Sequence, residues 1–110
     1  MRRGEVRWVE FDLLDKRRPA VILTRNSAIG YLSSVTVAPI TTTVRETPSQ
    51  VRLSQEDGLF TECAINLHNL QTVPKARIGG LIAVLSESKM DAIETALLFA
   101  LGMDHWLRRG

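Results

Sequence analysis

The sequence has a single cysteine, Cys63, among its 110 residues. One cysteine cannot close an intrachain disulfide, and it cannot supply a four-cysteine zinc site. Long apolar runs are missing as well, since no stretch approaches the roughly 18 residues that a membrane-spanning helix needs. The first residues contain no apolar signal-peptide core. We therefore expect a cytoplasmic protein that makes no contact with a membrane.

Familiar catalytic motifs are also absent from the sequence. The two histidines, His68 and His105, lie far apart, and neither belongs to a pair with metal-ligand spacing. The sequence has no Gly-rich phosphate loop, no Gly-x-Ser-x-Gly motif and no paired-carboxylate motif. We expect an activity, if there is one, that needs no metal and no other cofactor.

Aromatic residues make up 5% of the chain, so extensive stacking of nucleobases on aromatic rings is not expected. Positive charge is present in clusters rather than in excess: the net charge is +2, the pI is about 9.1, and cations gather near the start, at 16–18 and at 108–109. Such clusters concentrate phosphate groups. Alternatively they are solvated charges that keep the protein soluble, and composition by itself favours this alternative.

The length leaves room for one domain, which we expect to span residues 1–110, with a core of about 3–102 and a C-terminal tail of 103–110. Short segments of strand character follow one another without an intervening helix: 5–12, 19–24, 34–41, 50–54, 63–68, 69–73 and 81–85. This spacing predicts an antiparallel barrel or sandwich. A change of apolar phase within 5–12 predicts a bulge or burial on both faces, and Pro39 predicts an edge strand or a bulge.

One helix is predicted near the C-terminus. Ser86 or Ser88 can cap its start, the latter with Asp91 in a capping-box spacing, and Gly102 is a plausible stop. Its last turns, 97–101, are apolar all round, whereas a terminal helix can bury only one side against its own barrel. A second copy of the chain is the simplest partner for the other side, the alternative being a helix sunk deep in its own fold.

Two local features are candidates for phosphate binding or catalysis. Arg17 and Arg18 precede Pro19 at the start of a buried strand, and Thr41 and Thr42 directly follow another strand's Pro-Ile pair. An arginine fork fits two phosphate oxygens, and a threonine hydroxyl adds one hydrogen bond. Taken by spacing alone, an ordinary surface arginine and a threonine run of high β-propensity remain the favoured interpretation.

The order of the segments along the chain favours a functional site over ordinary surface residues. Taken together, the segments resemble the MazF/PemK family of toxin endoribonucleases from bacterial toxin–antitoxin systems. The resemblance covers about residues 3–102, and its parts are Arg3-Gly4-Glu5-Val6, Trp8-Val9-Glu10-Phe11, Arg18-Pro19-Ala20-Val21-Ile22-Leu23, Val37-Ala38-Pro39-Ile40-Thr41-Thr42, Pro48-Ser49-Gln50-Val51-Arg52-Leu53, Asp57-Gly58, Asn69-Leu70-Gln71-Thr72-Val73, Ile78-Gly79 and the helix end from Ala96-Leu97 to Leu101-Gly102.

The resemblance implies a mainly β fold, an SH3-like barrel of the CcdB/PemK type with a C-terminal helix, forming a homodimer in the bacterial cytoplasm. It also implies sequence-selective cleavage of single-stranded RNA, and a cognate antitoxin whose acidic, flexible segment blocks the site. Arg18 and Thr41 are the implied catalytic residues. The candidate substrate-binding residues are Lys16, Arg17, Thr42, His68, Asn69 and Gln71.

The expected reaction uses the 2′-hydroxyl of RNA as the nucleophile, with Arg18 neutralising charge in the transition state and Thr41 donating a hydrogen bond to it. Arginine is a poor proton acceptor at neutral pH, so the general base stays open, with His68 as one candidate. The sequence departs from the family in its first loop, where 13–17 replace a longer Gly-Ser-Glu-type segment, and no role of that segment carries over. Two alternatives remain: a gyrase-poison toxin on the same fold, and a non-catalytic SH3-like RNA-binding module.

Overall fold

The computed structural model describes residues 1–11 and 17–105. Its strands are β1 (Glu5–Val9), β2 (Arg18–Ile22), β3 (Ser34–Thr41), β4 (Gln50–Leu53), β5 (Cys63–Asn66), β6 (Gln71–Pro74) and β7 (Ile78–Val84). Its helices are α1 (Asn26–Ile29) and α2 (Glu87–Ala100), and single 3₁₀ turns occupy Gln55–Asp57, Leu67–Asn69 and Lys75–Arg77. The predicted strands are all present. The short α1 and the 3₁₀ turns between them were not predicted.

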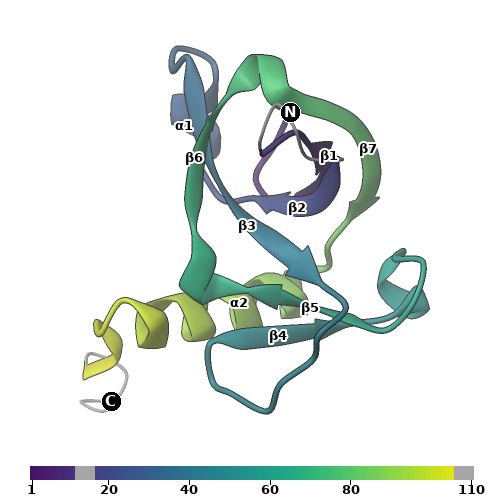
Figure 1. The fold of residues 1–110 in the computed structure, drawn as a ribbon. Coiled ribbons are helices and arrows are strands. Elements are labelled where there is room, and N and C mark those ends of the chain that lie inside the picture. The colour runs from purple at the N-terminus through teal and green to yellow at the C-terminus, as the bar shows by residue number, and fades with distance from the viewer. Residues whose placement is uncertain (12–16, 106–110) are drawn as a thin grey trace.

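The strands form one antiparallel sheet in the order β4-β5-β3-β2-β1-β7, with β6 also paired to β3. In Figure 1, β6 continues through the turn at Lys75–Arg77 into β7, so that β7, β1, β2, β3 and β6 curl into a ring. The β4–β5 hairpin extends from one side of this ring and packs on α2. The prediction of a mainly β barrel with a C-terminal helix is confirmed.

Alternate residues of β2 and β3 enter two different apolar clusters. Ala20 and Val37 belong to the cluster inside the ring, which also contains Val9, Ile22, Ile29, Val35 and Val73. Val21 and Ala38 point the other way, into the cluster that α2 covers with Ile93 and Ala96. Where both faces are buried, in 19–22 of β2 and 37–40 of β3, consecutive residues are apolar, whereas the first half of β3 alternates polar and apolar residues. Burial on both faces therefore fixes the positions of the residues at the ends of these strands, Arg18 in β2 and Thr41 in β3.

Pro39 does not lie in an edge strand, which was one of the two settings predicted for it, the other being a bulge. β3 pairs with β2 along one side, and along its other side it pairs first with β6, up to Val37, and then with β5, from Ile40. Pro39 falls between these last two pairings, where a residue without an N–H costs the ladder least. The predicted bulge near β1 is confirmed, because the pairing of β1 with β7 shifts register on both sides of Arg7.

β5 and β6 are separated by the 3₁₀ turn Leu67–Asn69, so the predicted strands 63–68 and 69–73 were respectively too long and begun too early. The side chain of Asn66 accepts a hydrogen bond of 3.3 Å from the His68 N–H. That bond satisfies a backbone donor locally, as asparagine often does at the end of a strand. His68 is therefore an exposed turn residue and not a strand residue.

Helix α2 begins at the Ser86 cap, whose hydroxyl accepts a 3.2 Å hydrogen bond from the Lys89 N–H. Of the two caps that the sequence allowed, Ser86 is the one used. The helix ends as predicted at Gly102, whose φ of +71° is the left-handed conformation that glycine adopts readily. Past its buried middle the helix exposes apolar side chains, with Phe99 at 42% and Leu101 at 54%. No helix among the described residues is long and apolar enough to cross a membrane.

Candidate functional site

The antiparallel register of β2 and β3 brings Arg18 and Thr41 together. Ala20 lies opposite Pro39 in this ladder. Just beyond this pair, β2 begins at Arg18 and β3 ends at Thr41, and both residues line one cavity. Side chains at opposite positions of neighbouring strands share a face and lie within reach of one another. Two residues 23 positions apart in sequence thus become neighbours.

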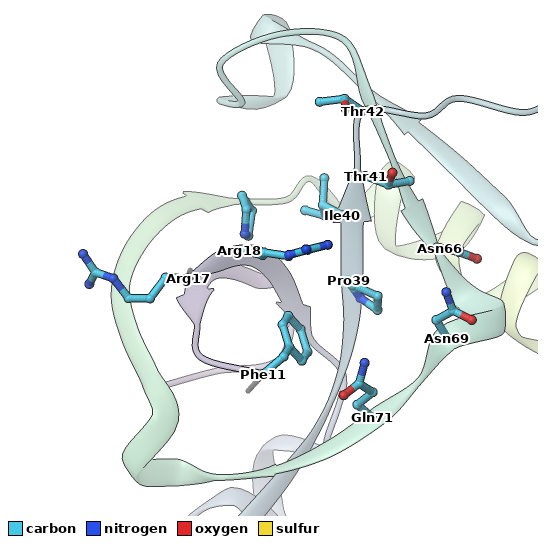
Figure 2. Close-up of a pocket in the computed structure, with 11 residues that line it drawn as sticks. Phe11, Arg17, Arg18, Pro39, Ile40, Thr41, Thr42, Asn66, Asn69 and Gln71 are labelled. Carbon is cyan, nitrogen blue, oxygen red and sulfur yellow. The ribbon is translucent and has the colours of Figure 1, made fainter. Parts of the chain in front are cut away.

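A cavity of about 450 Å³ lies around this pair. Figure 2 shows its side chains converging from β2, from the end of β3 and from the segment that joins β5 to β6. The residues that line it are Phe11, Arg17, Arg18, Pro19, Pro39, Ile40, Thr41, Thr42, Asn66, Asn69 and Gln71. It therefore holds both predicted catalytic residues and four of the predicted binding residues.

The Thr41 hydroxyl has a defined orientation. Its oxygen accepts a 3.1 Å hydrogen bond from the Thr43 N–H. A hydroxyl carries one hydrogen and two lone pairs, so accepting this bond leaves the hydrogen available for donation. Thr41 is thereby prepared as a donor to an oxygen atom placed in the cavity.

Arg17 and Arg18 differ in direction. The Arg18 guanidinium lies beside β3, level with Pro39 and Ile40, whereas Arg17 extends to the opposite side, toward β7 (Figure 2). A Cβ built on Gly79 of β7 would lie 3.6 Å from Nη1 of Arg17. The Arg17 guanidinium therefore lies at ordinary contact distance from β7. Of the two arginines that line the cavity, Arg18 lies on the β3 side and Arg17 lies at the rim.

Neutral amides form the wall opposite Arg18. Asn69 lines the cavity from the turn Leu67–Asn69 and Gln71 from the start of β6, and Asn66 stands beside Thr41 (Figure 2). Each amide offers both donors and acceptors. These amides can therefore distinguish between the hydrogen-bonding edges of flat polar groups. The arginines cannot, because they only donate hydrogen bonds.

His68 does not line this cavity. It lines an adjoining one of about 320 Å³, which shares Thr41 and Asn66 with the first and also includes Arg45 and Gln50. The reason is the turn after β5, which carries the His68 side chain away from the Arg18 side. Lys16, another predicted binding residue, lies outside the described residues, as do the shortened-loop residues 13–16.

The sequence did not indicate Phe11 or Asn66 as site residues. Phe11 follows β1, and its carbonyl oxygen accepts a 3.2 Å hydrogen bond from Nη1 of Arg77. This bond to a distant residue fixes the backbone of Phe11 next to the cavity. Asn66 could have been predicted from the sequence. It ends a buried strand three residues before Asn69, so it lies at the same break in the sheet.

The described part of the chain contains no cluster of three or more His, Cys, Asp or Glu side chains that could hold a metal ion. The donors around the cavity are instead arginine, hydroxyl and amide groups. This set suits a phosphate with attached polar rings: the arginine takes the negative charge, the hydroxyl completes its hydrogen bonds, and the amides face the rings.

Comparison with known proteins gives a consistent result. Residues 2–101 match the model of the PemK-like, MazF-like toxins of type II toxin–antitoxin systems. The endoribonuclease MazF3 of Mycobacterium tuberculosis is 40% identical over 91 residues, which make up 83% of this chain and 88% of that protein. The probable endoribonuclease MazF5 of the same species is 40% identical over 96 residues, 86% of this chain and 87% of that protein.

Solved structures resemble the whole fold. The Mycobacterium tuberculosis toxin MazF-mt6 superposes with a TM-score of 0.83 at 36% identity, covering 91% of this chain and 98% of that one. An endoribonuclease in complex with its cognate antitoxin, from a mycobacterial species, gives a TM-score of 0.84 at 29% identity over 94% of this chain and 96% of that one. The family indicated by the order of sequence segments is thus confirmed: the chain belongs to the PemK-like, MazF-like toxins of type II toxin–antitoxin systems.

Proposed function

We propose that this toxin cuts single-stranded RNA at selected sequences, through the RNA's own 2′-hydroxyl and without a metal ion, with Arg18 and Thr41 as its catalytic residues. It is an RNA-cleaving enzyme of the MazF kind, as its relatives are by name. The observation that carries the proposal is one cavity, at the ends of the neighbouring strands β2 and β3, that is lined by both the arginine and a threonine whose hydroxyl hydrogen can be donated.

The reaction needs no nucleophile from the protein. The 2′-oxygen attacks the adjacent phosphorus in line, its proton is lost, and the bond from phosphorus to the 5′-oxygen breaks. The leaving oxygen takes up a proton, so the products are a 2′,3′-cyclic phosphate, or the 3′-phosphate formed from it by water, and a 5′-hydroxyl. Negative charge grows on the phosphoryl oxygens in the transition state.

Arg18 and Thr41 act on this growing charge. Arg18 presents its planar donors to two phosphoryl oxygens, and Thr41 donates its hydroxyl hydrogen to one of them. Because both are held at the ends of rigid strands, little reorganisation is needed as the charge develops. Removing one such preorganised donor costs about 10²- to 10³-fold in rate.

Base choice falls to the surrounding residues. Asn69 and Gln71, with Asn66 beside them, can hydrogen-bond the edges of unstacked bases. His68, in the adjoining cavity behind Thr41, faces the next nucleotide along the strand rather than the scissile phosphate. Arg17 and Thr42 at the rim, together with Lys16, contact the backbone, where affinity depends on salt.

The test is cleavage of a long single-stranded RNA in EDTA, beside its all-deoxy counterpart. Wild-type protein should cut the RNA at discrete sites and leave the DNA intact. Arg18→Ala should abolish detectable cleavage, and Thr41→Val, which keeps the shape and removes the hydroxyl, should slow it about 10²- to 10³-fold. End analysis should give cyclic or 3′-phosphates and 5′-hydroxyls.

Arg52→Ala is the matched control, because it removes the same charge from an exposed position on β4 outside this cavity. It should cut at the wild-type rate. Cleavage by Arg18→Ala at the wild-type rate contradicts the assignment of Arg18. Loss of all wild-type cleavage in EDTA contradicts metal independence, and cleavage of DNA contradicts the use of the 2′-hydroxyl.

The two alternatives from the sequence are not favoured. A gyrase poison would leave Arg18 dispensable, and a simple RNA-binding module would bind RNA but leave it intact. The family and its named endoribonucleases support cleavage instead. If several unrelated RNA sequences all remain intact, the gyrase poison and the RNA-binding module become the favoured functions.

The partners follow from the same reasoning. The protein is proposed to work in the bacterial cytoplasm as a homodimer, associated through the apolar end of α2 and the groove of about 510 Å³ beside it, which Leu23, Leu32, Leu70, Leu97 and Leu101 help to line. Its cognate antitoxin is proposed to carry an acidic, flexible segment, because such a segment complements the arginines of the cavity. The mycobacterial relative solved with its antitoxin supports this partner.

A further inference from the structure

Phe60 is the most exposed aromatic side chain near the catalytic pair. It lies between the turn at Gln55–Asp57 and β5, with 63% of its surface exposed. Its ring stacks on the half-buried Trp8 of β1, with centroids 5.8 Å apart and planes inclined by 24°. A ring backed by another ring keeps its orientation while its free surface faces solvent.

A small cavity joins this ring to the catalytic pair. It measures about 90 Å³ and is lined by Pro19, Ile40, Thr41, Thr42, Leu59, Phe60, Thr61 and Cys63. Pro19, Ile40, Thr41 and Thr42 also line the main cavity, so the two are contiguous. A strand bound with its phosphate at Arg18 and Thr41 has a neighbouring residue within reach of Phe60.

The lining of the small cavity is uncharged. Burial, together with the charge of Asp57, raises the pKa of the Cys63 thiol above its ordinary value, so the thiol is neutral near pH 7. Side chains without charge suit the flat, uncharged part of a nucleotide, whereas Arg18 suits the phosphate. At about 90 Å³ the space receives the edge of a ring and leaves its face to Phe60.

We infer that Phe60, backed by Trp8 and set over this small cavity, is a stacking subsite for one nucleobase that flanks the scissile phosphate. This inference rests on the proposed RNA cleavage and adds to it a binding residue that the aromatic content did not lead us to expect. Stacking is sequence-tolerant, because every base has a π-face. The subsite therefore supplies affinity at one position, while the amides of the main cavity supply selectivity.

The test begins with a short RNA that contains one mapped cleavage site. Each nucleotide next to the scissile phosphate is replaced in turn by an abasic ribonucleotide. At one of these positions the loss of the base should lower kcat/KM of the wild type about 5- to 150-fold, the range for one stacked base. Phe60→Leu should lower kcat/KM on the intact RNA by a similar factor, and Phe60→Tyr should restore it.

The decisive measurement is the combination of the two changes. If base and ring stack on each other, the abasic position that harms the wild type should cost Phe60→Leu little more. Tyr31→Leu, which removes another exposed aromatic in the turn after α1, is the matched control and should not couple to any abasic position.

The outcomes are separable. An inactive wild type contradicts the proposed function itself. A wild type that cleaves, with Phe60→Leu and the abasic changes additive at every position, contradicts the stacking subsite alone. If Phe60→Leu cleaves normally but binds the antitoxin more weakly, the ring contacts a protein and the inference is wrong. A wild type that tolerates every abasic change overturns it without any variant.

Discussion

Glu5 shows how one carboxylate ties the start of the chain to the sheet. Its Oε1 atom accepts a 2.9 Å hydrogen bond from the Arg2 N–H and another of 2.9 Å from Nε of Arg7. Burial alone would raise the pKa of Glu5, but these two hydrogen bonds and the positive charge of Arg7 outweigh it, so the pKa lies below its ordinary value of 4.5. The carboxylate therefore stabilises the fold in its charged form.

Glu5→Gln should lower the free energy of unfolding by about 1.5 kcal/mol at pH 7, the scale of a hydrogen bond to a charged group. A carboxyl with a lowered folded pKa stabilises above its unfolded pKa, and this contribution is lost as the pH falls through the folded value. The difference between wild type and variant should therefore shrink as the pH falls below about 4.5. Urea unfolding at pH 7 and pH 3 measures it.

Glu10→Gln is the control for this experiment, because Glu10 is exposed and directly follows the same strand. It should change stability by less than about 0.5 kcal/mol at either pH. If Glu5→Gln costs the same at pH 3 as at pH 7, the shape of the side chain matters and its charge does not.

Among the site residues, the sequence was informative wherever chemistry and strand position coincided. Arg18 and Thr41 could be predicted to lie at the ends of buried strands, and the register then brings them together. Phe11 and Phe60 could not, because their proximity to the site depends on a distant hydrogen bond in one case and on a ring contact with Trp8 in the other. Their roles in the site remain proposals.

At the scale of elements, the strands with both faces buried were the easiest to predict. The paired segments of β2 and β3 meet a different cluster on each face, and the observed bounds of both strands differ little from those predicted. A boundary between two strands was predicted within Leu67–Asn69, but the 3₁₀ turn there was not, since it accompanies the exchange of β3 between two partners. The local sequence contains no signal that β3 changes its pairing strand from β6 to β5.

Helix α2 offers a test of its predicted start. Ser86→Ala removes the hydroxyl that accepts the Lys89 N–H, and it should lower the free energy of unfolding by about 1 kcal/mol. Ser88→Ala, at the other cap that the sequence allowed, should cost less than about 0.5 kcal/mol. The midpoints of urea unfolding, at an unchanged dependence of the unfolding free energy on urea concentration, measure both losses of stability. Equal losses in the two variants would mean that the helix start is not fixed by Ser86.

At the scale of the whole molecule, apolar surface remains at one end. Phe99, Leu101 and Met103 expose 42%, 54% and 47% of their surface, and the groove beside α2 reaches across to Leu32. Exposed apolar side chains gathered at one place often mark an interface. The proposed homodimer covers them with their own counterparts around a two-fold axis.

Leu101→Glu should therefore shift the protein from dimer to monomer, because it introduces a charge at this apolar end. Thr95→Glu introduces the same charge on an exposed position of the same helix and should leave the association unchanged. Sedimentation equilibrium over a range of concentrations measures both. A monomeric wild type, or a Leu101→Glu variant that associates as strongly as the wild type, would count against this interface.

The candidate site depends on strands that come late in the chain. The strand that carries Thr41 is held from one side by β5 and β6, and β2, which carries Arg18, is held by β1, whose other neighbour is β7. A chain still emerging from the ribosome lacks β7 until residue 84 has been made, and so has no closed ring. We therefore expect the cavity that holds Arg18 and Thr41 to form only when the chain is nearly complete.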